Sequence, residues 1–509
     1  MTSNKKQKLR QSFAVSLAVL GFVSTLCLNA RSKNVKTENV MSVNIPAASA
    51  QTTRKTYYVS PTGNNSNPGT ATQPWRNINY AVGSTSPVTA GDTILIQPGT
   101  YTGLVTLGKS GNSTSGHITL KANGRVVLRD PDPINGGFRE GVIQSANKSY
   151  WIIDGFRIEN TSWAGISLRD ASNMIVQNNH TYQTGASGII VLPENYYNGG
   201  ELEITSSNIK ILRNTIERAN WRWTSLSSTE GTQEALSIWG VNGFEVAYNT
   251  LKEGNREGID AKVGSRNGSI HDNTVTRQAL VSGTANGYRG GPAIYLDGNR
   301  AKMFNIDIYN NLVYNNTADA IAIADEVTDI GDVSNIRVYN NVIYGNGIQG
   351  VNGGAGIKID RNVSNVQVFH NTIAKNVQAF IVVDAYSYTS GYQPYQIQLQ
   401  NNIFADSSYR NGYISNAQNI VLKNNLYTDK FPNFYDNGGG VQSLSSLNNI
   451  KVASAGFINL TGNDFHLSST SPAINVGSKD GISYIQFDKD GKARIQSISV
   501  DIGAYESSF

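Results

Sequence analysis

Short stretches in which apolar and polar residues alternate recur along most of this chain. Each stretch runs into an asparagine, as in ILRNTI, VAYNTL, IYNNLV and VFHNTI. Alternation with a period of two is typical of a β-strand with one buried face, because a helix repeats its apolar positions every three or four residues. The pattern therefore predicts many short strands separated by tight turns.

The recurring asparagine is found at intervals of 23 to 38 residues. The positions are Asn179, Asn214, Asn249, Asn273, Asn311, Asn341, Asn371, Asn402 and Asn425. A repeat of this length is typical of a solenoid. Asparagine tolerates the left-handed bend of a turn, and its side chain can hydrogen-bond to neighbouring backbone. We therefore predict an all-β chain that folds as a right-handed parallel β-helix with an internal asparagine ladder.

The first residues have the pattern of a secretory signal. Basic residues from Lys5 to Arg10 precede an apolar stretch at 13–28, and small residues offer cleavage sites after Ala30 or Ala50. The apolar stretch is short for a membrane span. We expect a secreted protein, extracellular or periplasmic, that is monomeric and has no membrane attachment after cleavage; an uncleaved anchor is the alternative.

Four regions follow from these patterns. Residues 1–50 are predicted to form the signal peptide and leader, 51–130 the N-terminal cap and first coils, 131–430 the central parallel β-helix, and 431–509 the final irregular coils and C-terminal cap. A short amphipathic helix after Pro74 is expected to cover the open N-terminal end, because a stack of repeats needs a cap.

Removing the leader changes the charge of the chain. Seven of the 42 basic residues and one of the 37 acidic residues lie in the leader, which leaves 35 basic and 36 acidic residues. This balance gives no reason to expect a nucleic-acid partner. The single cysteine, Cys27, also lies in the leader, so a mature protein would have no disulfide.

A set of ionisable and aromatic residues gathers when the strands that precede successive rungs are aligned. Outward positions of three consecutive coils carry Trp239, Asp260, Lys262, Tyr295 and Asp297, and Glu234 and Glu257 stand just before two of these strands. Adjacent rungs would lie about 4.8 Å apart. A solenoid needs no such set on an exposed face, so we expect a functional site there.

The ends of the chain and one central phrase resemble known proteins. The opening TYYVSPTGNNSNPGTATQPW and the closing DIGAYE resemble those of secreted bacterial right-handed β-helix proteins, particularly polysaccharide lyases. REGIDAK at 256–262 resembles the strand with the catalytic lysine in the family 9 pectate lyases. It also resembles the chondroitinase B and alginate lyase family, where acidic calcium ligands precede that lysine. The resemblance implies an acidic polysaccharide substrate, a Ca²⁺ cofactor and Lys262 as the base.

A uronate lyase removes a weakly acidic proton next to a carboxylate, and it needs a positive charge there to stabilise the intermediate. A lysine base must lose its own proton first, which the charge of calcium favours. The candidate residues are Lys262, Asp260 and Asp297 for catalysis, Trp239, Tyr295, Arg289 and Arg300 for substrate binding, and Glu234, Glu257, Asp260 and Asp319 for the metal.

Other readings of the same residues stay open. Lys262 can be a surface lysine that pairs with Asp260 or Asp297, the two glutamates can be hydrated, and Trp239 can pack under a loop. Asp260, Asp297 and Asp360 can also supply the two carboxylic acids that a glycoside hydrolase needs. A uronate epimerase on the same fold and a non-catalytic carbohydrate-binding surface protein are further alternatives, because fold alone does not decide function.

Overall fold

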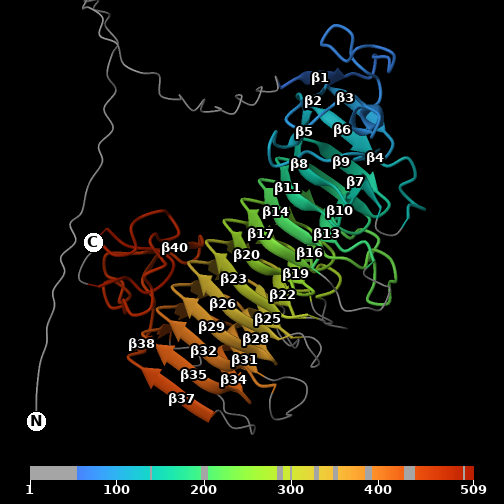
Figure 1. Cartoon of the computed structure of the whole chain (residues 1–509). Coiled ribbons are helices and arrows are strands. Elements are labelled where there is room, and N and C mark those ends of the chain that lie inside the picture. Colours follow the sequence, from blue (N-terminus) through green and yellow to red (C-terminus); the bar gives the residue numbers. More distant parts are fainter. Residues whose placement is uncertain are drawn as a thin grey trace, which may run out of the picture. The chain divides into compact units, whose positions relative to one another are not determined.

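The computed structural model describes residues 54–137, 140–195, 204–283, 291–298, 301–325, 332–347, 354–383, 392–428, 442–496 and 499–508. Successive coils stack so that their strands form three parallel sheets, which run the length of the stack (Figure 1). The predicted parallel β-helix is thereby confirmed. The leader at 1–50 lies outside the described residues.

The first sheet has fourteen described strands. In order of pairing they are β1 (Thr56–Val59), β2 (Thr93–Ile96), β5 (Ile118–Ala122), β8 (Ser149–Asp154), β11 (Ser172–Gln177), β14 (Ser206–Leu212), β17 (Val241–Ala247), β20 (Arg266–His271), β23 (Met303–Tyr309), β26 (Val333–Tyr339), β29 (Val363–Phe369), β32 (Tyr395–Gln400), β35 (Gln418–Lys423) and β37 (Gln442–Leu447). We call it sheet A.

The second sheet, sheet B, has thirteen described strands. They are β3 (Gly99–Thr102), β6 (Val126–Arg129), β9 (Arg157–Thr161), β12 (His180–Thr184), β15 (Thr215–Glu217), β18 (Thr250–Lys252), β21 (Thr274–Thr276), β24 (Leu312–Tyr314), β27 (Val342–Tyr344), β30 (Thr372–Ala374), β33 (Ile403–Ala405), β36 (Leu426–Thr428) and β38 (Ile450–Val452).

The third sheet, sheet C, has eleven described strands. They are β4 (Val105–Thr106), β7 (Gly141–Ala146), β10 (Ala164–Arg169), β13 (Ile189–Leu192), β16 (Leu236–Trp239), β19 (Ile259–Lys262), β22 (Ile294–Asp297), β25 (Ile321–Ala324), β28 (Ala355–Asp360), β31 (Gln378–Val383) and β34 (Arg410–Ser415). A separate antiparallel pair joins β39 (Phe457–Asn459) to β40 (Asp464–Leu467).

One continuous core fills the space between the three sheets. In β23, for example, Met303, Ile306 and Ile308 point inward and are fully buried. The same cluster of buried apolar side chains runs from Tyr57 in the first coil to Tyr427 near the last. Each coil thus buries its apolar positions against the coils above and below it, which is why the alternation recurs in every coil.

The asparagine ladder is formed at the corner between sheets A and B. On a typical rung, Asn214 Nδ2 donates to Asn249 Oδ1 at 3.0 Å and to the Val176 carbonyl at 2.9 Å. The backbone N–H of Asn214 also donates to Asn249 Oδ1, at 2.8 Å. The amide therefore satisfies corner backbone groups that water cannot reach.

The ladder differs from the expectation in two details. The residue with the left-handed backbone is the one before each ladder asparagine, such as Arg213 (φ 55°) before Asn214. The ladder also continues to Asn449, whose Oδ1 accepts a hydrogen bond from Asn425 Nδ2 at 3.0 Å. The alternating pattern did not reveal this last rung, because the strand before it, QSLSSL, is mostly polar.

The helix α1 (Ile78–Val82) is close to where the sequence predicts one. Ile78, Ala81 and Val82 are buried in the main core, and the helix contacts β1, β2 and β4. Its role as a cap stays a prediction. Among the residues that the structure describes, none lies in a helix with the length and apolar character needed to cross a membrane.

The C-terminal residues pack against the side of the β-helix. Phe465, Leu467 and Ile502 cover apolar side chains of β27, β30, β33 and β36 on the outside of sheet B. Ile482 and Val500 cover Phe369 on the outside of sheet A. Strands β37 and β38 still belong to the parallel sheets, whereas the residues after 454 leave them.

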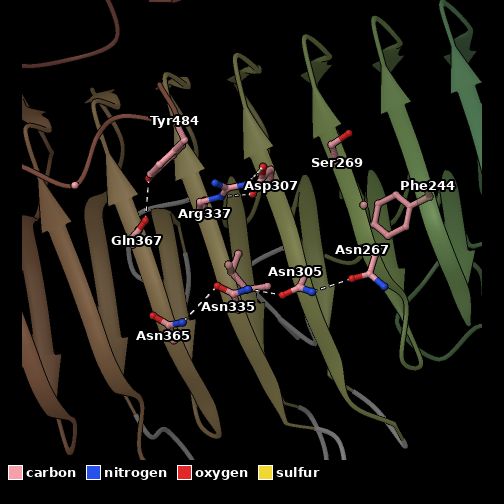
Figure 2. Close-up of a pocket in the computed structure, with 13 residues that line it drawn as sticks. Phe244, Asn267, Ser269, Asn305, Asp307, Asn335, Arg337, Asn365, Gln367 and Tyr484 are labelled. Atoms are coloured by element: carbon pink, nitrogen blue, oxygen red, sulfur yellow. Dashed lines mark hydrogen bonds and ion pairs between the residues drawn. The ribbon is translucent and has the colours of Figure 1, made fainter. Parts of the chain in front are cut away.

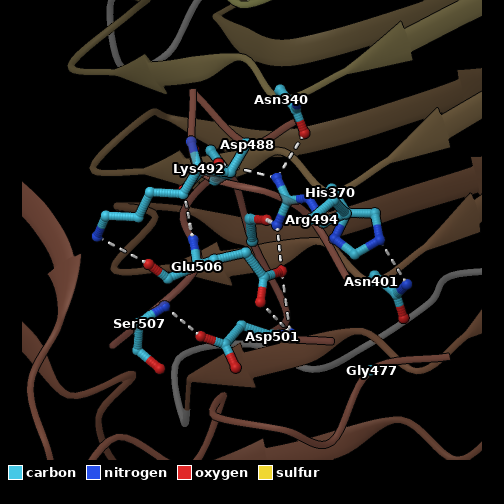
Figure 3. Close-up of polar contacts among 12 residues, drawn as sticks. Asn340, His370, Asn401, Gly477, Asp488, Lys492, Arg494, Asp501, Glu506 and Ser507 are labelled. Carbon is cyan, nitrogen blue, oxygen red and sulfur yellow. Dashed lines mark hydrogen bonds and ion pairs between the residues drawn. The ribbon is translucent and has the colours of Figure 1, made fainter. Parts of the chain in front are cut away.

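A buried arginine holds this C-terminal part in place (Figure 3). Arg494 Nη1 donates to Glu506 Oε1 at 2.7 Å, and Nη2 donates to Asn340 Oδ1 at 2.6 Å across 154 residues of chain. Asp488 Oδ2 accepts the backbone N–H of Glu506 at 2.7 Å. Burial raises the pKa of Glu506 to about 7, although the Arg494 guanidinium opposes the shift.

We expect Asn341→Ala to lower the midpoint of urea unfolding sharply. The amide of Asn341 donates to the Ile308 carbonyl and to Asn371, and its loss leaves buried backbone groups without partners. Each such group costs about 1–3 kcal/mol, so the loss should be at least about 3 kcal/mol. Asn448→Gly, at an exposed left-handed position, is the control and should change stability by about 0.5 kcal/mol or less.

We expect Glu506 to make the protein less stable as the pH rises from about 5 to about 7. Its pKa is raised in the folded state, so the folded protein holds this proton more tightly than the unfolded chain does. The contribution is at most about 3 kcal/mol, because a tenfold change in proton affinity corresponds to about 1.4 kcal/mol. Glu506→Gln should flatten this part of the stability profile in urea unfolding at several pH values; an unchanged slope would contradict the assignment.

Candidate functional site

The register of sheet C places the aligned residues as the sequence analysis predicts. Strands β16 and β19 pair Ser237 with Asp260 and Trp239 with Lys262. Strands β19 and β22 then pair Asp260 with Tyr295 and Lys262 with Asp297. The predicted columns are therefore present on the outer side of sheet C, on three adjacent rungs.

Lys262 lies at the centre of this arrangement. Its Nζ atom is 2.6 Å from Glu234 Oε1 and 3.2 Å from Asp260 Oδ2. The same ammonium lies 4.8 Å from the centre of the Trp239 ring. Glu234 comes from the turn before β16, and Lys262 ends β19, so the stacking of two coils is what brings the pair together.

A second cation joins the group from the turn before β19. Arg256 Nε donates to Glu257 Oε2 at 2.9 Å, and its guanidinium lies 4.4 Å from the centre of the Trp223 ring. Ser237 donates a short hydrogen bond to Glu234. We call Lys262, Glu234, Asp260, Arg256 and Glu257 the Lys262 cluster.

The cluster is more buried than an exposed solenoid face would be. The exposed fractions are 9% for Lys262, 3% for Glu234 and 1% for Asp260. Trp239 is 3% exposed and packs with Trp163 and other apolar side chains on the outside of sheet C. The expectation of an exposed face is wrong, because ion pairs and apolar contacts cover these side chains.

Burial and charge shift the pKa values of the cluster in opposite directions. Burial alone would lower the pKa of Lys262, but the carboxylates of Asp260, Glu234 and Asp297 outweigh it, and the pKa is raised. Burial, reinforced by Glu234 and Glu257, raises the pKa of Asp260 well above its usual value. Burial would also raise the pKa of Glu234, but Lys262 and Arg256 outweigh this effect, and the pKa is lowered. Lys262 therefore holds its proton more tightly than an ordinary lysine, Glu234 holds its proton less tightly than an ordinary glutamate, and Asp260 holds its proton more tightly than an ordinary aspartate.

The remaining candidates take different positions. Tyr295 is half-buried beside Asp260, and Asp297 is buried beside Lys262. Trp239 packs as a wall of the cluster, so its face is not open to a sugar ring as expected. Arg289 and Arg300, the proposed substrate-binding arginines, lie outside the described residues, and their role stays a prediction.

Two of the calcium ligands expected from the resemblance have other partners in this structure. Calcium needs six to eight oxygen ligands. Among the described residues, no three carboxylates or imidazoles converge in a way that could hold a metal ion. The acids face cations or backbone instead: Glu234 pairs with Lys262, and Asp319 Oδ1 accepts the Ala355 N–H at 2.7 Å. Calcium dependence therefore stays a prediction.

Two members of the site were missed in the sequence. Arg256 stands in the phrase REGIDAK, and its position beside Glu257 was the available signal, because a buried acid needs a nearby cation. Ser237 stands in an outward column, but a serine at such a position gives no indication that it will bond to Glu234 from the preceding turn.

Two family models match the chain in partly overlapping regions. "Pel9A-like, right handed beta helix region" matches residues 57–215, and "Right handed beta helix region" matches residues 140–328. The uncharacterized protein YwoF of Bacillus subtilis (strain 168) is 28% identical over 290 residues, which is 51% of this chain. The chain spans 56% of the length of that relative.

Several solved structures are similar at low identity. Pectate lyase Pel9A has a TM-score of 0.45 and 17% identity, covering 89% of this chain and 97% of its own. The alginate lyase from Paenibacillus sp. str. FPU-7 has a TM-score of 0.45 and 17% identity, covering 67% and 99%. The A-module of mannuronan C-5 epimerase AlgE6 from Azotobacter vinelandii has a TM-score of 0.47 and 14% identity, covering 71% and 91%. Similarity at this level carries no information about the reaction. By the two family models and its three parallel sheets, the chain is a right-handed parallel β-helix protein with a Pel9A-like region at residues 57–215.

Proposed function

We propose that this protein is a polysaccharide lyase that cleaves an acidic, uronate-containing glycan at the Lys262 cluster. The observation that carries the proposal is a buried lysine that contacts two acidic side chains, Glu234 from the preceding coil and Asp260 from its own strand, with Asp297 on the next rung. The Pel9A-like region at 57–215 lies immediately before these coils in the chain and supports the same class of fold. Buried, desolvated ionic groups of this kind are typical of functional sites.

The proposed reaction is a β-elimination. A base removes the proton at C5 of a uronate, the electron pair forms the C4–C5 double bond, and the bond from C4 to the glycosidic oxygen breaks. The departing oxygen takes up a proton. Lys262 is the proposed base, and Asp260, whose raised pKa makes it hold its proton more tightly than an ordinary aspartate, is the proposed proton donor to the leaving group.

The charge around Lys262 sets a condition on this reaction. Lys262 must lose its proton before it can act, and the neighbouring carboxylates favour the protonated form. The fraction of active enzyme therefore increases as the pH rises. Added positive charge at the cluster would have the same effect, which is why calcium is included as a variable in the experiment below.

A glycoside hydrolase is the second candidate, and one observation favours it. Asp260 has a raised pKa and Glu234 a lowered one, so the two neighbouring carboxyl groups differ in how tightly they hold a proton. Opposite shifts of this kind separate the acid from the base or nucleophile in glycosidases. A hydrolase would produce new reducing ends without the ultraviolet absorbance of an unsaturated uronate.

We expect the full chain to produce ultraviolet-absorbing unsaturated uronate from pectate, alginate or a glycosaminoglycan. Each polymer is assayed with calcium and with a chelator. The rate should rise with pH from about 6 to 9, because the base has a raised pKa. New reducing ends without absorbance, at a rate that falls over this pH range, would replace the lyase with the hydrolase. No turnover of any polymer would exclude both enzymes.

Lys262→Arg should abolish the lyase reaction while the protein stays folded. Arginine keeps the positive charge that Glu234 and Asp260 need, but it cannot give up its proton. We expect the rate to fall by about a hundredfold or more. Lys358→Arg is the matched control, since Lys358 also pairs with an aspartate on sheet C, Asp360, at 3.0 Å. Full activity in Lys262→Arg, with circular dichroism unchanged in both variants, would show that Lys262 has only a structural role.

A further inference from the structure

A second candidate site lies on a different sheet from the Lys262 cluster. A groove of about 710 Å³ follows the outer side of sheet A across β17, β20, β23, β26 and β29, and Gly481 and Tyr484 of the C-terminal part form one of its walls. Figure 2 shows two rows of polar side chains along its floor, each with one residue per strand.

The first row consists of exposed asparagines, namely Asn267, Asn305, Asn335 and Asn365. Asn305 Nδ2 donates to Asn267 Oδ1 at 2.9 Å, and the same contact repeats from Asn335 to Asn305 and from Asn365 to Asn335. All four have a left-handed backbone, with φ between 52° and 57°. The bonds along the row therefore fix the direction in which every amide points (Figure 2).

An amide in such a row keeps unused hydrogen-bonding capacity. A side-chain amide has two N–H donors and two acceptor sites on its oxygen. An asparagine inside the row donates one N–H to one neighbour and accepts one hydrogen bond from the other neighbour. The side chains are exposed, so the second donor and the second acceptor face the groove or solvent. The row thus offers a donor and an acceptor on each strand, about 4.8 Å apart.

The second row contains one basic and one acidic side chain, and these two form an ion pair. Its members on β20, β23, β26 and β29 are Ser269, Asp307, Arg337 and Gln367. Arg337 makes a two-pronged ion pair with Asp307, at 2.6 Å from Nε to Oδ1 and 2.5 Å from Nη2 to Oδ2. Its guanidinium also lies 4.5 Å from the centre of the Tyr484 ring. No described side chain in the groove is left with an uncompensated charge.

The wall and one end of the groove are each held by a direct contact. The Tyr484 hydroxyl donates to Gln367 Oε1 at 3.0 Å, which ties the C-terminal part to the floor. At the other end, the ring of Phe244 lies over Gly268, where a Cβ atom would come within 2.4 Å of that ring. These contacts are made without a ligand, so binding would lose little free energy to ordering the groove.

We propose that this groove binds an uncharged stretch of an oligosaccharide. Sugar hydroxyls both donate and accept hydrogen bonds, so they match a row of amides that does the same, and the neutral floor gives no preference for a uronate. The site goes beyond the proposed lyase activity, because it is built on sheet A and shares no residue with the Lys262 cluster. It would hold a polymer on the protein surface without cleaving it.

Calorimetric titration of the full chain tests the proposal. The probes are cellohexaose and xylohexaose, which are uncharged, and hexagalacturonate, which is acidic. We expect at least one uncharged probe to bind and hexagalacturonate to bind at least about tenfold more weakly at this groove. Equal or tighter binding of hexagalacturonate through the groove, or no binding of either uncharged probe, would overturn the proposal.

Variants locate the binding. The double variant Asn305→Gly with Asn335→Gly removes two amides but suits the left-handed backbone, so the fold should be kept. Losing two hydrogen bonds should weaken binding about tenfold or more. The control is Asn173→Gly with Asn208→Gly, a pair on β11 and β14 with the same backbone and the same Nδ2-to-Oδ1 contact, which lies outside the groove. Equal losses in both double variants would overturn the proposal.

Two further variants distinguish binding in the groove from the effect of changing the exposed asparagines and from the lyase activity. Ser269→Trp fills the groove without changing an asparagine, and it should abolish binding. Lys262→Arg should leave binding of the uncharged probe unchanged even when it abolishes turnover, so the two proposals can fail independently. Binding that survives Ser269→Trp would place the ligand elsewhere and overturn the groove assignment.

Discussion

The described coils of this protein turn a buried corner between sheets A and B, and the backbone groups at that corner must find partners without water. From Asn179 to Asn449 the ladder asparagines meet this constraint. Each buried amide donates to a carbonyl of an earlier coil and to the next asparagine, while its oxygen accepts a backbone N–H and an amide N–H from the previous rung. The ladder therefore fixes the register between coils, because a shift by one residue would leave buried polar groups unpaired.

Once the register is fixed, the outer faces follow from it. Residues that occupy the same position in successive coils stack in columns, whatever the length of the loops between them. On sheet C the columns bring Glu234, Asp260 and Lys262 together, and on sheet A they produce the row of exposed asparagines. A parallel β-helix thus converts a one-dimensional repeat into ordered surfaces, and its chemistry is decided by which side chains fill a few equivalent positions.

The Lys262 cluster shows how burial limits this chemistry. Two cations, Lys262 and Arg256, stand among the carboxyl groups of Glu234, Glu257, Asp260 and Asp297, and burial among the other acids raises the pKa of Asp260. The same proximity that assembles the site also holds Lys262 in its charged form. Such a group can be a reaction centre or an ion-pair network, because both require desolvation and close opposite charges.

The sequence by itself determined the fold, the ladder and the columns of sheet C. These features depend on a local alternation of apolar and polar residues and on one residue type that recurs, so they can be read without knowing which coils meet. Only the tertiary structure decided how deeply Lys262 and Trp239 are buried, that Arg256 completes the cluster, and that the C-terminal part packs on the side of the stack to form a groove with Tyr484. Burial, ion pairing and the Arg494 contact to Asn340 join residues from different coils or far along the chain, and no periodic pattern encodes such contacts.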